Sequence, residues 1–577
     1  MRENGSKDAA DRAKTVSAKL NPWLRVFPSL TDVAFILPIA FLFLRMDGLK
    51  YLLGDGDTGW HLRTGEWILQ NGRVPDRDLF SFTKAGQPWY AWEWLWDATF
   101  AKLYQFGGLT AVIIASIAII CATYAVLYRL MRRKCGNGLL SIAVLVPVMA
   151  ASSIHWLARP HLVTLLFFAI WYSILERVHD GNRKLLWLLP AITVLWTNLH
   201  GGFLAGIVML LVYAAGEFVT WIVAADAAAR RAALGRSKPY LISAAACLAA
   251  SLINPYSYHL HVHMFRYLTD PFQYEHIVEF MSLSFQHPAA PFFECMLLLG
   301  SIAAIWHICH RRFIYPVLML IWGHAALFSA RNIPMYMIAA APPLAQAIEE
   351  ILAAAENVSI AAWMKKSVRV FREWAAEFGE LDRFGTIPMA SALAIGVLTA
   401  LTLAPNAPAK LRAEYDPKNF PVKAIGVLRG PEFSRGIFTN DSWGGYLIYR
   451  LYPQTKVFVD GRSDFYGSEF DKRFMDVMDG NYKWKRILQK YDIRAVLLPV
   501  DASLASTLKE SSLWRPVYDD GIAIVFRNTA GPIQAAGAVA SEALQVSAGN
   551  AGGISRGLTT TKQTDSDLQD RASYARR

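Results

Sequence analysis

The stretch GDGDTGWHLRTGEW, residues 54–67, places two aspartates, a histidine and an arginine shortly after the first long apolar run of the chain, at 30–47. An apolar run of this length approaches the roughly twenty residues that a helix needs to cross a bilayer. Polar side chains at the end of a membrane span are either an ordinary helix start or one side of a functional site. The choice depends on which side of the membrane the stretch faces, and therefore on the topology of the whole chain.

The composition is that of a membrane protein. Of the 577 residues 54% are hydrophobic and only 18% are charged, which excludes an ordinary soluble protein. The net charge of +12 does not require a nucleic-acid partner, because excess Lys and Arg collect in the cytoplasmic loops of polytopic membrane proteins. The five cysteines fall in or beside apolar runs, without the spacing of a metal or disulfide framework, and are expected to be packing residues.

The apolar runs predict about eleven membrane-spanning helices. They lie at 30–47, 109–131, 138–156, 161–177, 185–200, 203–223, 239–256, 291–309, 314–330, 333–353 and 386–404. With the basic N-terminal segment (1–29) inside, every even-numbered connection should be cytoplasmic, and each of them is basic. These connections are Arg132–Lys134, Glu176–Lys184, Arg230–Lys238, His310–Arg312 and the segment with Lys365, Lys366, Arg369 and Arg372. The alternation predicts an integral membrane protein with a cytoplasmic N-terminus.

The opposite connections carry most of the polar chemistry. The first is the long loop 48–108, in which WYAWEWLWDATFAKLY is typical of a helix lying in the headgroup layer. The others carry ARPH (158–161), NLHGG (198–202), NPYSYHLHVHMFRY (254–267) and ARN (330–332). Polar residues at membrane depth are expensive and tend to line a cavity. Their convergence on one side is the strongest functional signal in the sequence.

After the transmembrane region (30–404), a soluble-looking segment at 405–530 is expected on the outer side. GIFTND, KVFVDG, AVLLPV and IAIVFRN look like buried strands that alternate with helical segments, which favours a small α/β domain with a mostly parallel sheet. Within it, the NDSWGGYL loop could bind phosphate, although a glycine turn that packs a helix on a strand is the favoured explanation, and the VDGRSDFY loop could bind sugar. The tail at 531–577 has the composition of a disordered segment.

The pair Asp55 and Asp57 has a spacing used for general-base or divalent-metal chemistry. The simpler alternative is that Asp57 caps the helix that follows. The position on the outer face, with His61 and Arg63 one turn further on, favours a functional role, in which Asp57 would be the base and Asp55 a second acid or a metal ligand.

Further candidates for substrate binding come from the other outer connections. Arg159 and Arg331 could hold a phosphate with their planar guanidinium groups, or could simply reach toward the headgroups. The remaining candidates are His161, Asn198, His200 and Asn332. The alternating His259, His261 and His263 would share a face, as a zinc site requires, only in a strand.

These features resemble those of the GT-C superfamily of integral-membrane glycosyltransferases. The similarity to bacterial members of that superfamily lies in the stretches GDGDTGWHLRTGEW, ARPH, NLHGGF and NDSWGGYLIYRL…VFVDGRSDFY. The resemblance covers roughly residues 30–400. It implies a polyprenyl-phosphate-linked sugar donor, a glycan, lipid or protein acceptor, and a catalytic acidic residue in the first outer loop, for which this sequence offers Asp57 or Asp55. Better-known members have Asp-Glu at this place, so Asp-Gly-Asp departs from their pattern.

Two other functions fit parts of the sequence. A transporter or flippase of a lipid-linked saccharide would share the arginines and aromatic residues but would need no general base, and it usually shows internal repeats, which are not evident here. A non-catalytic membrane protein with a partner-binding outer domain would leave the polar cluster on the outer face without a role.

Overall fold

The computed structural model describes residues 25–359, 361–385 and 387–529, and among these the residues up to Asn528 belong to one compact unit. Each of the eleven apolar runs falls on a helix. These helices are α2 (Leu30–Arg45), α4 (Trp94–Cys135), α5 (Gly138–Ser152), α6 (His161–His179), α7 (Leu188–Leu199), α8 (Phe203–Ile222), α9 (Ala227–Ala250), α12 (Ala290–Cys309), α13 (Ile314–Phe328), α14 (Ile333–Ala355) and α16 (Met389–Thr402).

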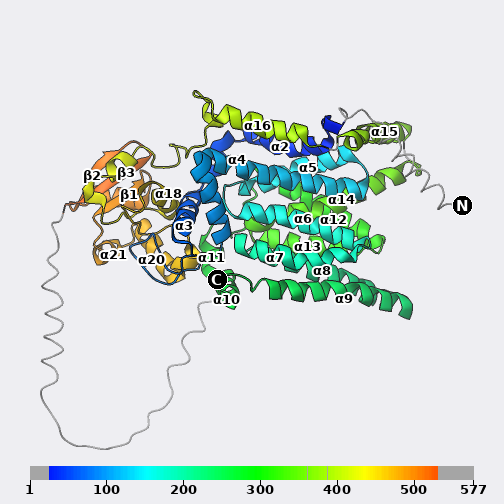
Figure 1. Cartoon of the computed structure of the whole chain (residues 1–577), viewed down its shortest axis with the longest axis horizontal. Helices are drawn as coiled ribbons and strands as arrows, with labels where there is room; N and C mark the ends of the chain where they lie inside the picture. The colour runs from blue at the N-terminus through cyan, green and yellow to red at the C-terminus, as the bar shows by residue number, and fades with distance from the viewer. Residues whose placement is uncertain (1–24, 360, 386, 530–577) are drawn as a thin grey trace, which may run out of the picture. The chain divides into compact units, whose positions relative to one another are not determined.

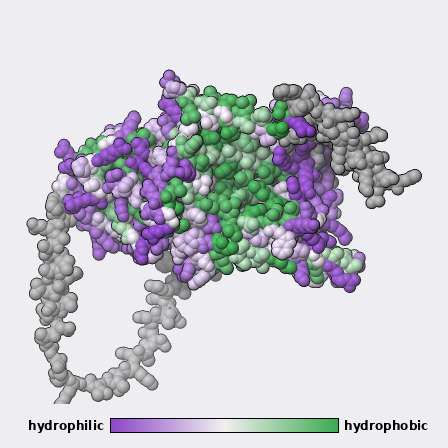
Figure 2. All heavy atoms as spheres, in the orientation of Figure 1, coloured by the Kyte–Doolittle hydropathy of each residue, from purple (hydrophilic) through white to green (hydrophobic). Residues whose placement is uncertain are grey.

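The bundle is that of an integral membrane protein. Six of the helical segments that the structure describes are long and apolar enough to cross a membrane, and α13 and α16 are shorter apolar helices. Figure 2 shows an apolar band across the visible face of the bundle, with hydrophilic surface on both sides of it. The number of eleven spans stays a prediction.

The two ends of the bundle differ in what they carry. At one end lie α3 (Asp57–Asn71), α10 (Tyr258–Leu268), α11 (Pro271–His276) and the C-terminal segment (Figure 1). At the other end, α15 (Ala362–Phe384) contacts the end of α4, where Arg132 pairs with Asp382 at 2.8 Å. Arg236 of α9 pairs with Glu217 of α8 at 2.8 Å at this same end. The basic connections and the connections with the candidate site residues therefore lie at opposite ends, and which end faces outward stays a prediction.

The tryptophan-rich stretch does not form the expected helix at the membrane surface. α4 begins only at Trp94, and Trp89 and Trp96 are 4% and 1% exposed. Trp96 stacks on Phe100 at a centroid distance of 3.5 Å, and Trp89 packs edge-on against Trp60. The interfacial prediction is wrong for Trp89 and Trp96, because the first loop folds back on itself and buries them.

The C-terminal segment contains both helices and strands. Its helical elements are η6 (Ala409–Leu411), α17 (Ile425–Leu428), η7 (Pro431–Phe433), α18 (Asp441–Leu451), α19 (Ser463–Tyr466), α20 (Ser468–Met478), α21 (Trp484–Lys490) and α22 (Ser503–Lys509). Its strands are β1 (Ala495–Pro499), β2 (Trp514–Asp519) and β3 (Ala523–Asn528). The elements mix helix and strand as the sequence predicts.

The sheet differs from the mostly parallel one that the sequence suggests. Its order is β1-β3-β2 and both pairs are antiparallel, because a tight turn joins β2 and β3 into a hairpin and β1 pairs with the other edge of β3. The two earlier predicted strands form only isolated parallel bridges, which pair Ile437 with Val457, Val457 with Ser81, and Phe438 with Val496. The sequence missed β2, an edge strand that contains a proline and is largely exposed.

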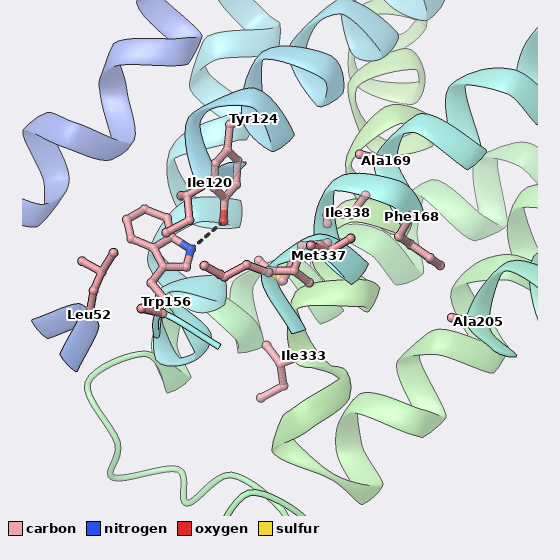
Figure 3. Packing of buried hydrophobic residues seen from close by; sticks show 14 of the residues in the cluster. Leu52, Ile120, Tyr124, Trp156, Phe168, Ala169, Ala205, Ile333, Met337 and Ile338 are labelled. Atoms are coloured by element: carbon pink, nitrogen blue, oxygen red, sulfur yellow. Dashed lines mark hydrogen bonds between the residues drawn. The ribbon is translucent and has the colours of Figure 1, made fainter. Parts of the chain in front are cut away.

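Short 3-10 helices bring chain connections to the end of the bundle that carries α3. They are η2 (Gly48–Leu53), η3 (Ser153–His155) and η5 (Ala330–Asn332), whereas η4 (Arg183–Trp187) joins α6 to α7. Figure 3 shows Leu52, Trp156 and Ile333 packed in the core, with the Trp156 indole donating to the Tyr124 hydroxyl at 3.2 Å. Each of these three anchors lies two or three residues from a candidate site residue.

Glycines allow the C-terminal segment to approach the first loop closely. A Cβ on Gly445 of α18 would lie 2.5 Å from the Gly56 carbonyl oxygen, and one on Gly59 would lie 2.3 Å from the Gly445 carbonyl oxygen. Backbone meets backbone here, so no side-chain movement could relieve such a contact. The N-terminus of α3 is thus held from one side by α18.

We expect Gly445→Ala to separate α18 from α3 and to lower the free energy of unfolding by about 1–3 kcal/mol, the usual cost of overpacking. Thermal melting in detergent measures this loss. Gly426→Ala in α17 is the control, because a Cβ there meets nothing within 4 Å. Equal melting temperatures for wild type and Gly445→Ala would contradict the close packing.

Candidate active site

The two aspartates of the opening stretch lie at the start of α3. The helix begins at Asp57 itself, the residue before it is Gly56, and the Asp55 carboxylate accepts the backbone N–H of Asp57 at 2.9 Å. Asp57 therefore does not cap the helix, because the N-cap position belongs to Gly56. Asp57, which is 5% exposed, directs its side chain to other groups.

Arg159 joins three carboxylates that come from distant parts of the chain. Its Nη1 lies 2.6 Å from Asp55 Oδ2 and 2.6 Å from Glu279 Oε1, and its Nη2 lies 3.0 Å from Asp57 Oδ2. Arg159 carries one positive charge, which can balance only one of the three carboxylates. A second positive charge comes from Arg331, whose Nε lies 3.8 Å from Glu279 Oε2. The arrangement is a compact, mostly buried charge cluster.

Backbone hydrogen bonds fix the connections that supply these side chains. The Ala158 N–H donates to the Leu52 carbonyl at 2.8 Å, which ties the ARPH turn to the segment before Asp55. The Arg331 N–H donates to the Glu279 carbonyl at 3.1 Å, which ties the loop after α11 to η5. The core anchors and these backbone hydrogen bonds together fix the connections from which the side chains of the cluster extend.

The cluster pushes the proton affinities of its carboxylates apart. Burial, together with the nearby Asp55 carboxylate, raises the pKa of Asp57 well above its usual value, although Arg159 opposes the shift. Burial also acts to raise the pKa of Glu279, but Arg159 and Arg331 outweigh it and lower that pKa. Two carboxylates with divergent proton affinities in one site are the usual mark of an acid–base assignment.

A second network lies beside the first and includes Glu93. Burial raises the pKa of the Glu93 carboxyl to about 8, so this group carries a proton at neutral pH. Its Oε1 lies 3.4 Å from His200 Nε2, and its Oε2 lies 3.6 Å from His61 Nε2. Burial lowers the pKa of both histidines, that of His200 to about 3, which keeps the imidazoles neutral.

The orientation of His200 follows from its other contacts. The backbone N–H of Gly202 points at His200 Nδ1 at 3.0 Å, so Nδ1 is an acceptor and the ring proton lies on Nε2, toward Glu93. Thr164 Oγ1 lies 2.7 Å from the same Nδ1 and itself accepts from the Trp196 indole at 2.9 Å. The NLHGG turn thus holds a neutral imidazole in a fixed tautomer.

Two neighbouring cavities adjoin these networks. The larger, of about 330 Å³, has mostly apolar walls from α6, α8, α10, α13 and α14, and its polar lining includes His161, His200, Arg331 and Asn332. The smaller, of about 50 Å³, is lined by Asp57, Glu93, Arg159 and other polar residues. Trp92, Tyr267 and Arg331 line both, so the apolar cavity and the polar cavity are neighbours at these three residues.

The C-terminal segment closes the smaller cavity. A Cβ on Gly461 would lie 2.1 Å from Asp57 Oδ1, so the VDGRSDFY loop lies directly over that carboxylate. Arg462 is 2% exposed, pairs with Asp460 at 2.7 Å and Asp78 at 2.8 Å, and faces the Trp89 ring at 4.5 Å. Gly461, Arg462 and Asp464 all line the cavity, which makes this segment part of the site.

No protein-family model matches the chain, and no curated protein matches its sequence. The three-dimensional structure, however, is similar to solved structures. The archaeal oligosaccharyltransferase AglB from Archaeoglobus fulgidus, in complex with an inhibitory peptide and a dolichol-phosphate, aligns with a TM-score of 0.50 and 11% identity, over 88% of this chain and 74% of that chain. The Archaeoglobus fulgidus oligosaccharyltransferase tethered to an acceptor peptide aligns with a TM-score of 0.49 and 11% identity, over 87% and 74%.

The chain has the GT-C fold. The resemblance found in the sequence is therefore confirmed for the fold. At 11% identity the likeness to AglB concerns the architecture alone, and the roles of individual residues rest on this chain's own geometry.

Most of the predicted site residues come together at one end of the GT-C bundle, but Arg63 and Asn198 do not join the site. Arg63 donates from Nε to the Tyr449 carbonyl at 3.0 Å and so fastens α3 to α18. Asn198 accepts from the Trp94 indole at 2.8 Å and donates to the carbonyls of Val194 and Ile253. The prediction that these two bind substrate is not supported by their positions, because their polar groups are used in packing.

The three alternating histidines lie on helix α10, where successive members point in different directions. His261 contacts Ser251 at 2.8 Å and His263 contacts Asp464 at 2.9 Å, so they share no ligand position. Within residues 25–359, 361–385 and 387–529, no group of three or more His, Cys, Asp or Glu side chains could hold a metal ion. At Asp55 and Asp57 the place of a cation is taken by the Arg159 guanidinium.

Sequence reasoning missed Glu93, Asp97 and Glu279. Asp97 contacts His61 Nδ1 at 2.6 Å and so sets the ring of that histidine. A signal existed for Glu93, a single acid within a run of tryptophans that were expected to meet lipid. Glu279 lies in a connection without any motif, and only the folded chain brings it to Arg159.

The raised pKa of Glu93 makes a prediction about stability. The folded protein keeps this proton to about pH 8 whereas an ordinary glutamate loses it near 4.5, so wild type should lose stability as the pH rises between these values. The glutamine side chain in Glu93→Gln cannot ionise. As the pH rises over this range, the unfolding free energy of the variant should increase relative to wild type by about 1 kcal/mol for each pH unit, and its melting temperature should rise accordingly.

Glu469→Gln is the matched control, because it removes the same charge from a side chain that is 88% exposed. Its melting curve should stay at a constant offset from wild type. A constant offset for Glu93→Gln as well would show that Glu93 is ionised at neutral pH.

Proposed function

We propose that this chain is a membrane glycosyltransferase that moves a sugar from a polyprenyl-phosphate-linked donor to an acceptor at the end of the bundle that carries α3. The observation that carries the proposal is the buried carboxylate of Asp57, with a raised proton affinity, beside an apolar cavity whose polar end is lined by Arg331 and His200. The GT-C fold supports this class of reaction.

The larger cavity fits the lipid part of such a donor. Its walls are supplied by Leu165, Leu204, Val208, Met264 and Met335, among others. Leu268 and Phe328, which also line it, are 40% and 52% exposed, so the apolar walls continue onto the outer surface of the bundle. AglB, which shares the fold, is described in complex with a dolichol-phosphate, and a ligand of the same chemistry is proposed here.

The phosphate of the donor would lie at Arg331, which lines both cavities. A planar guanidinium suits a phosphate. The Nε2–H of His200, whose 3.4 Å contact with Glu93 is longer than an ordinary hydrogen bond, adds a donor on the same side. From this position the sugar carbon bonded to the phosphate would extend into the smaller cavity, toward Asp57. Arg159, assigned to phosphate from the sequence, already has both terminal nitrogens occupied by carboxylates.

The reaction follows from these positions. The acceptor hydroxyl attacks the anomeric carbon of the sugar and its proton passes to the Asp57 carboxylate, which acts as general base. The bond between that carbon and the phosphate oxygen breaks, and the lipid phosphate leaves with the electron pair. Arg331 stabilises the charge that develops on the leaving phosphate. The proposed setting is the outer face of the bacterial inner membrane.

Asp57→Asn is the decisive variant, because it keeps the size of the side chain and removes the proton acceptor. We expect transfer of labelled sugar from a polyprenyl-phosphate donor to fall about 10²-fold or more, the usual scale of general-base loss, while the melting temperature changes little. The assay is run on detergent-solubilised protein with a panel of polyprenyl-phosphate-linked hexoses and pentoses, scoring release of polyprenyl phosphate.

Asp180→Asn is the matched control, since it breaks an ion pair with Arg133 at the opposite end of the bundle. Its activity should equal that of wild type. An active Asp57→Asn protein would remove the catalytic assignment. It would favour instead a transporter of lipid-linked saccharides, for which the same cavity needs no base.

A further inference from the structure

Three carboxylates surround one guanidinium in the site, and with Arg159 in place among them they form no metal site. Asp55, Asp57 and Glu279 come from the first loop and from the connection after α11, and each places an oxygen within 3.0 Å of the same guanidinium. Carboxylate oxygens are the ligands that Mg²⁺, Mn²⁺ and Ca²⁺ prefer. The point at which a cation would be expected is held by Arg159.

A metal ion does not fit beside Arg159. A divalent ion binds carboxylate oxygens at about 2.0–2.6 Å, and the oxygens that it would need already lie 2.6–3.0 Å from Arg159 Nη1 and Nη2. The guanidinium is always protonated, so the two cations would also repel each other at close range. Either the arginine or the metal can occupy this point, but not both.

Arg159 is also held too firmly to give way. Trp156, three residues earlier, is fully buried and hydrogen-bonded to Tyr124. The Ala158 N–H bonds to Leu52, and the Ala158 carbonyl accepts from the Thr58 hydroxyl at 3.1 Å. The turn that carries Arg159 is therefore bonded to the same loop that supplies Asp55 and Asp57, and its side chain is only 16% exposed.

We propose that Arg159 acts in place of a divalent metal ion, and that the site binds no such ion. The guanidinium gathers the three carboxylates, fixes Asp57 over the smaller cavity and supplies the positive charge that they require. Arg159 is thus a positioning residue and leaves the donor phosphate to Arg331. The catalytic part of this inference rests on the proposed function, whereas the absence of metal binding does not.

Mn²⁺ binding, followed by electron paramagnetic resonance and by thermal melting of the purified full chain, tests the inference. Wild type should bind no Mn²⁺ saturably, and neither Mn²⁺ nor EDTA should shift its melting temperature. In Arg159→Ala the three carboxylates lose their cation, so this variant should bind Mn²⁺ saturably, and Mn²⁺ should raise its melting temperature. Adding Asp57→Asn to that variant should abolish the gain.

Arg159→Lys keeps a positive charge in the cluster and should stay free of Mn²⁺, and Arg312→Ala, at the opposite end of the bundle, controls for loss of an arginine. Saturable Mn²⁺ binding by wild type that disappears in Asp57→Asn would overturn the inference, even if Arg159→Ala fails to fold. Sugar-transfer activity is measured separately. A metal-free wild type without transferase activity would refute the proposed function and leave this inference intact.

Discussion

The contact of Arg159 with Asp55, Asp57 and Glu279 is the interaction on which the rest of the site depends. Placing three carboxylates in a mostly buried position would be prohibitive without a cation among them, because each would lose its hydration without a partner. One guanidinium cannot neutralise all three, so the group keeps a high affinity for a proton. Asp57 carries that affinity, since Glu279 is held ionised by Arg159 and Arg331. The charges that hold the loops together therefore also make the buried Asp57 a stronger base.

The C-terminal segment belongs to this arrangement. Glycines at Gly56, Gly59 and Gly445 let α18 lie against the start of α3, and Gly461 brings the following loop over Asp57. A side chain at any of these positions would force the two parts of the chain apart. The segment that the sequence suggested as a small separate domain thus also forms one wall of the cavity at Asp57.

Each of the eleven apolar runs predicted the position of a helix, because length and hydropathy are local properties. The charge pattern of the connections separated the two ends for the same reason. The prediction of a mostly parallel sheet was wrong, because β1 and β3 pair through contacts between distant residues, which no local sequence pattern encodes. Within the site, Asp57 and Arg331 could be found as polar residues at span ends. Glu279 could not be found in this way, because only the folded chain brings its carboxylate into contact with Arg159.

The most direct measurement is a cryo-electron microscopy structure with a non-hydrolysable polyprenyl-phosphate sugar analogue. We expect the lipid in the cavity of about 330 Å³, its phosphate on Arg331 and His200, and the sugar directed toward Asp57. Arg159 should remain on its three carboxylates, without a metal ion beside it. A phosphate bound to Arg159 with the carboxylates released, or a lipid bound away from Asp57, would contradict the account.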